Sequence, residues 1–207
     1  MSTVSYFENL TEPSGLVVSL ASLKSWLKID GIDDDTELTF ILNAAQDKIA
    51  QYLGVTLLQH NIRGNYEGLE ISKFEKYPFI SFKRFPLDTM IQVAYWNGTT
   101  YTALTAGTDY VIKNRNSGYM RVLFKNTSAL GSLSIADDIA YPIIIDATIG
   151  YETVPYLIQE AIKQYAAFIY DNKGDCMECS CDSDGMASLP SIIRAGISKY
   201  KIREVFS

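Results

Sequence analysis

Three cysteines offer the most reactive side chains of this 207-residue chain. Cys176, Cys179 and Cys181 fall within six positions, and Asp182 or Asp184 would complete a four-ligand shell for zinc. Structural zinc sites usually draw on two separated ligand pairs, whereas these candidates crowd one glycine-containing loop. We therefore predict no metal site and interpret the segment as a loop between two helices. An odd number of cysteines in one loop also argues against a disulfide framework.

The single histidine, His60, lies at the end of a predicted strand. One histidine per chain cannot supply a multi-histidine metal site, and no serine motif points to a Ser-His-Asp triad around it. The sequence also lacks the glycine-rich phosphate loops and the Gly-x-Ser-x-Gly motif of hydrolases. We therefore predict that the protein is not an enzyme, with no catalytic residues and no cofactor.

Clustered carboxylates near residue 34 are the next side chains that could have a chemical role. Asp33, Asp34 and Asp35 would together suit a divalent cation. They equally suit the start of a helix, because Glu37 follows Asp34 by three residues and acidic groups favour the positive end of the helix dipole. We interpret them as helix-capping residues rather than as a metal site.

Two amphipathic helices must position these carboxylates. Ser19 is a suitable N-cap for the first helix, which we expect to end at Gly31. The second begins at the acidic cluster and ends at Gly54, a residue that readily takes the left-handed conformation of a helix end. The apolar residues recur at helical spacing on one face of each helix. They are Leu20, Leu23, Trp26 and Leu27 in the first helix, and Leu38, Ile41, Leu42, Ala45, Ile49, Tyr52 and Leu53 in the second.

After residue 60 the hydrophobic period changes to two, which indicates β-strands. Asn97 and Gly98 form a strong hairpin signal, because both residues tolerate a positive φ. A second hairpin and a closing apolar strand follow, so we expect one compact antiparallel sheet or a small sandwich. The predicted strands are residues 91–96, 99–104, 110–113, 119–124 and 142–149.

Helical spacing returns at Pro155, a residue well suited to the first position of a helix. This third helix carries an apolar face wide enough to contact two neighbours. A fourth helix opens at residues 188–190, with Ile192, Ile193, Ile197 and Tyr200 expected to point inward.

The order of these elements predicts an α+β fold. An antiparallel bundle of about four helices receives an antiparallel β-sheet module between its second and third helices. We assign residues 1–18 to an N-terminal arm outside the core, 19–59 and 151–207 to the bundle, and 60–150 to the β module.

Charge is unevenly spread along the chain. The net charge of −6 argues against non-specific binding to nucleic acid or to an anionic membrane. No apolar run approaches the roughly 20 residues of a membrane span, and the first 13 residues lack a signal-peptide pattern. Residues 19–54 hold three basic and six acidic groups, whereas residues 188–207 hold four basic and one acidic. An acidic body with a basic tail favours charge-complementary contact between copies or with an acidic partner.

Two motifs are more specific than the rest. The first helix pair spans residues 18–54, and the third helix is entered through Gly150 and Tyr151 followed by Val154 and Pro155. In these motifs, and in the order of elements over residues 18–203, the chain resembles the head-tail connector (adaptor) proteins of tailed bacteriophages.

The resemblance implies a structural virion protein. It implies a helical bundle that assembles by closed cyclic symmetry, in about 12 copies, into a ring between the portal and the tail. Its expected partners are other copies of itself, the portal protein and a downstream neck or tail protein, while DNA passes through without specific binding. The expected location is the neck of the virion, after assembly in the cytoplasm of the bacterial host.

The ring implied by the resemblance assigns roles to two sets of charged residues. A channel for DNA should be acidic or neutral, because basic walls would hold the phosphates. Asp34, Asp35, Glu37 and Asp47 are the candidates that line this channel. The basic tail residues Arg194, Lys199, Lys201 and Arg203 are the candidates that contact the portal or a neighbouring copy.

The alternative function is ligand binding by the β module on a helical stalk. Tyr95, Trp96 and Tyr101 would then recognise carbohydrate by stacking. Alternation along a strand places Tyr95 and Trp96 on opposite faces, so at most one of them is expected to be exposed.

Overall fold

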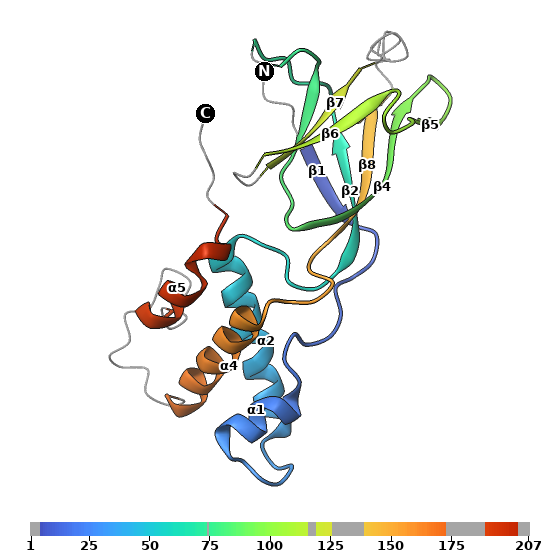
Figure 1. The fold of residues 1–207 in the computed structure, drawn as a ribbon. Coiled ribbons are helices and arrows are strands. Elements are labelled where there is room, and N and C mark those ends of the chain that lie inside the picture. Colours follow the sequence, from blue (N-terminus) through green and yellow to red (C-terminus); the bar gives the residue numbers. More distant parts are fainter. Residues whose placement is uncertain (1–4, 74, 116–118, 126–138, 173–188, 203–207) are drawn as a thin grey trace. The chain divides into compact units, whose positions relative to one another are not determined.

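The computed structural model describes residues 5–73, 75–115, 119–125, 139–172 and 189–202. The chain forms two compact units (Figure 1). A β unit contains the residues up to 13 and residues 59–151, and a helical unit contains residues 14–58 and 152–202. The predicted α+β fold, with the β module inserted between the second and third helices, is confirmed.

The β unit contains two antiparallel sheets, so of the two predicted arrangements the sandwich is the one that forms. The five-stranded sheet has the order β1-β2-β8-β4-β5 and the three-stranded sheet the order β3-β7-β6. The strands of the first sheet are β1 (Ser5–Asn9), β2 (His60–Tyr66), β8 (Ile143–Ile149), β4 (Leu87–Trp96) and β5 (Tyr101–Ala103). The strands of the second are β3 (Phe79–Phe82), β7 (Tyr119–Phe124) and β6 (Tyr110–Arg115).

One hydrophobic core joins the two sheets. The central strand β8 contributes every second residue to this core, as the pleat of a strand requires. Strands β3 and β7 of the second sheet supply the facing side chains, including Phe82 and Phe124. The buried members of the core are Ile62, Tyr66, Ile80, Phe82, Val93, Tyr110, Met120, Val122, Phe124, Ile143, Ile145, Ala147 and Ile149.

The N-terminal segment corrects one prediction. Residues 5–9 form strand β1, which pairs antiparallel with β2 from Ser5 opposite Tyr66 to Asn9 opposite Ile62. The ring of Phe7 packs edge-on against Tyr66 and Phe82. The prediction of an arm outside the core is therefore wrong for these residues. A five-residue edge strand with Phe7 packed on the core is too short to show a hydrophobic period.

Both predicted hairpins form. Trp96 pairs with Tyr101, so the first hairpin has a four-residue loop rather than the two-residue turn that Asn97 and Gly98 suggest. The Asn97 side-chain oxygen accepts hydrogen bonds from the backbone N–H groups of Thr99 and Thr100, both at 3.0 Å. This local bonding by asparagine competes with the tighter turn. The second hairpin joins β6 and β7.

A buried carboxylate braces the three-stranded sheet. The Glu75 side chain, only 3% exposed, lies 2.8 Å from Arg121 Nη1 on β7 and 3.0 Å from Lys113 Nζ on β6. The Arg121 guanidinium also lies over the ring of Phe79, 4.5 Å from its centroid. The hydrogen bonds from Lys113 and Arg121 lower the pKa of Glu75, against the opposing effect of desolvation.

We expect the Glu75 contacts to make the stability of the β unit depend on pH. Because the folded pKa lies below the unfolded one, the stabilisation is present above the unfolded pKa of about 4.3 and is lost as the pH falls through the folded pKa. Urea unfolding of wild type and Glu75→Gln should therefore differ more at pH 7 than at pH 3. Glu67→Gln, at an exposed position, is the control and should show no such change. An equal difference at both pH values would contradict the assignment.

The helical unit contains four helices among its described residues. Helix α4 packs against each of the other three, in keeping with the wide apolar face predicted for it. Its buried residues include Ile158, Ile162 and Tyr165, and α2 faces them with Leu38, Leu42 and Ala45 among others. The helices are α1 (Leu20–Leu27), α2 (Asp35–Leu53), α4 (Tyr156–Asp171) and α5 (Ser191–Ile197), and a 3-10 turn, η1 (Ser198–Tyr200), follows α5.

Helix ends follow the predictions with one correction. The Ser19 hydroxyl accepts the N–H of Ser22 at 3.2 Å, and Gly54 ends α2 with a φ of 69°. Helix α1 ends at Lys28 rather than at Gly31. Lys28 itself takes the left-handed conformation, with a φ of 56°, so the helix stops before the glycine is reached.

The fourth helix corrects the prediction that Ile192 points inward. Ile193 and Ile197 are buried, but Ile192 is 77% exposed. Successive helical residues point about 100° apart, so a seven-residue helix that packs through Ile193 and Ile197 turns Ile192 outward. None of the described helices has the length and apolar character to cross a membrane.

Candidate functional site

The charged residues predicted for the ring lie on two parts of the helical unit. The four acidic candidates lie at the start of α2 and along it, and the basic candidates lie on α5 and just after it. Arg203, like Cys176, Cys179 and Cys181, lies outside the described residues.

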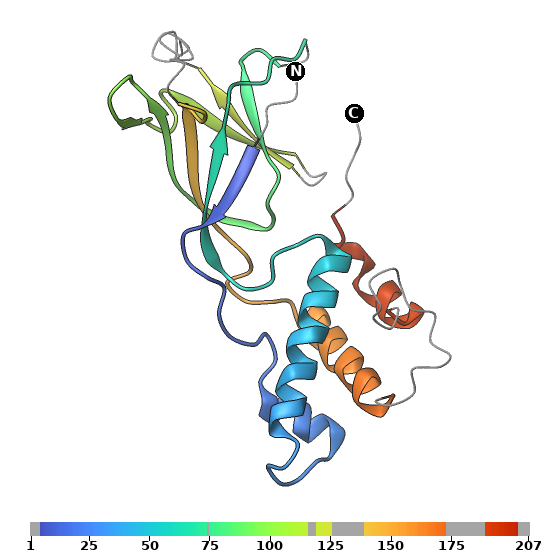
Figure 2. The same cartoon turned by 180° about the vertical axis from the view of Figure 1, so that it is seen from behind.

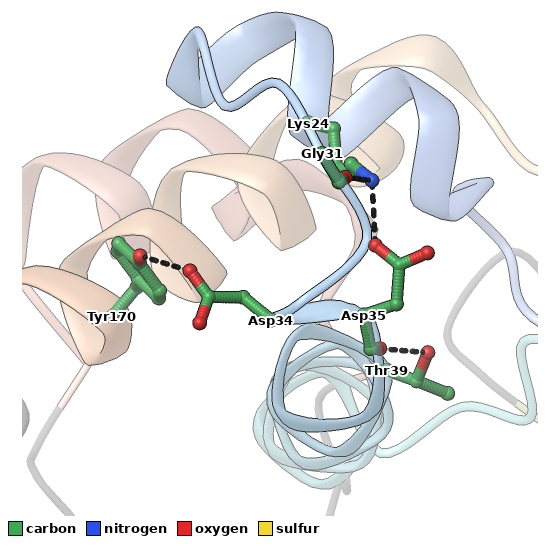
Figure 3. Close-up of polar contacts among 6 residues, drawn as sticks. All are labelled: Lys24, Gly31, Asp34, Asp35, Thr39 and Tyr170. Atoms are coloured by element: carbon green, nitrogen blue, oxygen red, sulfur yellow. Dashed lines mark hydrogen bonds and ion pairs between the residues drawn. The ribbon is translucent and has the colours of Figure 1, made fainter.

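Asp34 occupies the N-cap position of α2, but its side chain makes no capping hydrogen bond. The carboxylate instead accepts a hydrogen bond of 3.0 Å from the Tyr170 hydroxyl (Figure 3). Tyr170 lies in the last turn of α4, so this bond fastens the start of α2 to the end of α4. Asp34 therefore occupies the predicted N-cap position but does not make the capping hydrogen bond expected there.

Asp35 holds the loop between α1 and α2. The Lys24 ammonium lies 2.5 Å from Asp35 Oδ1 and also donates to the Gly31 carbonyl (Figure 3). The Thr39 hydroxyl donates to the backbone carbonyl of Asp35 at 2.7 Å. Asp34 and Asp35 are both half-buried and occupied by contacts inside the chain, so their first role is to order the helical unit.

Replacing Lys24 with methionine should lower the free energy of unfolding by about 1 kcal/mol. The change removes one ion pair and one hydrogen bond at a partly exposed position, where each contributes modestly. Chemical denaturation of the full chain measures the loss. Lys83→Met, at an exposed lysine of the β unit, is the matched control and should stay within about 0.5 kcal/mol of wild type. Equal losses in both variants would show that the Lys24 contacts contribute nothing of their own.

Glu37 and Asp47 differ from the first two carboxylates because both are exposed. Asp47 lies seven residues, or two helical turns, after Phe40 on the outward side of α2. Phe40 is 74% exposed, although α2 otherwise buries its large apolar residues. Asp34 and Asp35 are thus half-buried and order the helical unit, whereas Glu37 and Asp47 are exposed to solvent.

The three basic candidates that the structure describes are all exposed, and the two lysines each lie over a tyrosine ring. Arg194 and Lys199 are exposed, on α5 and η1. The Lys201 ammonium lies over the Tyr52 ring, 4.4 Å from its centroid, at the end of α2. The backbone N–H of Ile202 donates to the Leu53 carbonyl at 2.9 Å, which holds the chain after η1 against that end.

The aromatic residues of the first hairpin do not form an open stacking surface. Tyr95 packs against the core of the sandwich, and both Tyr95 and Trp96 are half-buried, in keeping with the expectation that at most one would be exposed. Trp96 and Tyr101 pack edge-to-face, with centroids 5.2 Å apart. The Tyr101 hydroxyl donates to the Tyr141 carbonyl at 2.7 Å. Within the described ranges, no group of three or more His, Cys, Asp or Glu side chains is arranged to hold a metal ion.

Sequence reasoning missed a partly buried ion pair in the five-stranded sheet, between a buried aspartate and an arginine that is one third exposed. Arg63 on β2 and Asp146 on β8 form two hydrogen bonds, of 2.7 and 2.9 Å. The bond to Asp146 raises the pKa of Arg63. A single acidic residue inside the apolar strand at residues 143–149 is the signal that could have revealed the pair, because buried carboxylates require a partner.

Comparison with known proteins gives one family match and several similar solved structures. Residues 17–78, which contain α1, α2 and β2, match the model of a family described as phage gp6-like head-tail connector protein. The search of curated proteins finds no match.

Three solved structures share the fold over nearly the whole chain. A chain from the neck of an empty gene transfer agent particle, computed with C6 symmetry, aligns with a TM-score of 0.66 and 16% identity, covering 98% of each chain. A chain from the virion of a native particle gives a TM-score of 0.61 and 17% identity over 97% of each chain. A chain from the neck of a native particle, computed with C12 symmetry, gives 0.60 and 16% over 98%. Together with the family match, these similarities confirm the resemblance to head-tail connectors.

Proposed function

We propose that this protein, a head-tail connector by its family match and its fold, works as one subunit of a closed ring in the neck of a phage or phage-like virion. Its neighbours there are other copies of itself, the portal protein and a downstream neck or tail protein. The work of such a ring is mechanical joining, and the proposal includes no chemical reaction.

One observation carries this proposal. The connector family match covers the first helix pair, and the fold match extends over 97–98% of chains taken from virions and necks. The neck structures were computed with sixfold and twelvefold symmetry. Closed cyclic symmetry of this kind supports a ring of about 12 copies for the present chain as well.

The charge of the chain suits a channel for DNA. A net charge of −6 per copy is multiplied by the number of copies, so the ring as a whole repels phosphate. Asp34 and Asp35 add to this field while ordering the helical unit. Glu37 is exposed at the first turn of α2, and we propose it as the carboxylate that faces the channel.

Ring formation is the direct test. The full-length chain should form closed rings at high concentration, or on addition of the portal protein of the same phage. Mass photometry would count the copies, and negative-stain electron microscopy would show the central hole. A chain that stays monomeric in both conditions would overturn the proposal.

A further inference from the structure

Helix α2 carries an exposed face with a large apolar side chain at its centre. The α2 outer face is defined here by Thr36, Phe40, Asn43, Asp47 and Gln51, all exposed and spaced by three or four residues. It lies opposite the buried side, which includes Leu38, Leu42 and Ile49. Phe40 is 74% exposed at the centre of this face, and aromatic side chains are enriched where proteins contact one another.

The end of the helical unit carries a second exposed surface with the opposite charge. The α5 outer face is defined here by Ile192, Arg194, Ala195 and Lys199, all of which are exposed. Ile192 is 77% exposed and supplies the apolar centre. Arg194 and Lys199 supply two positive charges, and in the described part of the chain neither forms an ion pair.

The two faces lie on different elements of the helical unit, α2 for the first and α5 with η1 for the second. Helix α4 packs against both α2 and α5 (Figures 1 and 2). Each face thus offers one large exposed apolar side chain, while the charge is negative on α2 and positive on α5. Within one copy the two residues do not cover each other, because Phe40 is 74% and Ile192 77% exposed.

We propose that the α2 outer face of one copy docks on the α5 outer face of the next copy, and that repetition of this contact closes the ring. This inference rests on the proposed function. Phe40 and Ile192 meet at the centre of the contact, and Asp47 pairs with Arg194 or Lys199 at its rim. Two different faces on each subunit make a heterologous contact, the kind that generates rings when the rotation closes.

Charge argues against the alternative contact, in which two copies meet through the same face. If two α2 outer faces met, Asp47 would find no opposite charge on the partner's face, because it is the only charged residue of the five. If two α5 outer faces met, the positive charges of Arg194 and Lys199 would repel their counterparts. Like charges brought together across an interface cost affinity, whereas the mixed contact pairs opposite charges.

Cysteine cross-linking separates the two arrangements. In a background with Cys176, Cys179 and Cys181 changed to serine, Phe40→Cys and Ile192→Cys are made as separate proteins and treated with a short bismaleimide. The mixture should give a cross-linked dimer, and neither protein alone should. A chain with both changes should give a ladder of oligomers. Cross-linking of either single variant with itself, or none in the mixture, would overturn the proposed contact.

Substitutions provide an independent measurement. Phe40→Asp and Ile192→Asp should each raise the concentration needed for half-assembly by about tenfold or more, because buried apolar anchors dominate such contacts. Ile71→Asp, at a residue of the β unit that is 88% exposed, should leave assembly unchanged. Circular dichroism confirms that each variant is folded. Asp47→Lys should weaken assembly, and combination with Arg194→Glu and Lys199→Glu should restore it.

The outcomes distinguish this inference from the proposed function. Wild-type rings together with normal assembly of Phe40→Asp and Ile192→Asp would overturn the assignment of the faces and leave the connector function standing. A wild-type chain that forms no ring, alone or with the portal protein, would overturn both.

Discussion

Replacing Arg63 with alanine is expected to lower the free energy of unfolding of the β unit by about 3–5 kcal/mol. The Asp146 side chain is only 8% exposed, and Arg63 holds both of its oxygens. Once Arg63 is removed, the carboxylate remains in the sheet without its charged partner, and the cost of desolvating it is no longer offset. Urea denaturation of the full chain, followed by near-UV circular dichroism, measures the change.

Two further variants make this result specific. Glu160→Ala breaks an ion pair with Lys163 on the surface of α4 and should cost less than about 1 kcal/mol. The double change Arg63→Met with Asp146→Leu removes both charges and should recover most of the lost stability. If Arg63→Ala costs no more than Glu160→Ala, the buried pair does not stabilise the sheet.

Replacing Phe82 with alanine should cost about 3–5 kcal/mol and should also loosen the N-terminal strand. Phe82 is fully buried in β3, and its ring packs edge-on against Phe7 of β1, with centroids 5.6 Å apart. The change leaves a cavity in the core that joins the two sheets. It also removes one of the two aromatic rings against which Phe7 packs.

Hydrogen exchange of the native protein tests the second part of that prediction. Amide protons of Ser5–Asn9 should exchange faster in Phe82→Ala than in wild type, because β1 lies at the sheet edge and is held by few side chains. Phe40→Ala is the matched control, since the same ring is lost from an exposed position, and stability should change by less than about 0.5 kcal/mol. Unchanged exchange at residues 5–9 would show that the Phe7 contact does not hold the strand.

Local patterns were enough to predict most of the elements. The helical period of α2 and α4, the Ser19 cap, the glycine at the end of α2 and the two hairpins each depend on residues close together in the chain. The connector resemblance also follows from local motifs, in the helix pair and in the entry to α4. Strand β1 was missed because its pairing with β2 joins residues more than 50 positions apart.

The candidate site shows the same division between local and long-range information. The sequence alone determined which residues carry charge, that an acidic helix precedes a basic tail, and that no familiar catalytic motif is present. Only the tertiary structure decided which of these charged side chains form hydrogen bonds or ion pairs with distant parts of the chain. Asp34 meets Tyr170 across 136 positions and Arg63 meets Asp146 across 83, whereas Phe40 and Ile192 are turned outward. A helical or alternating period shows on which face of a helix or strand a residue lies. Packing against elements distant in the sequence determines whether that face is buried.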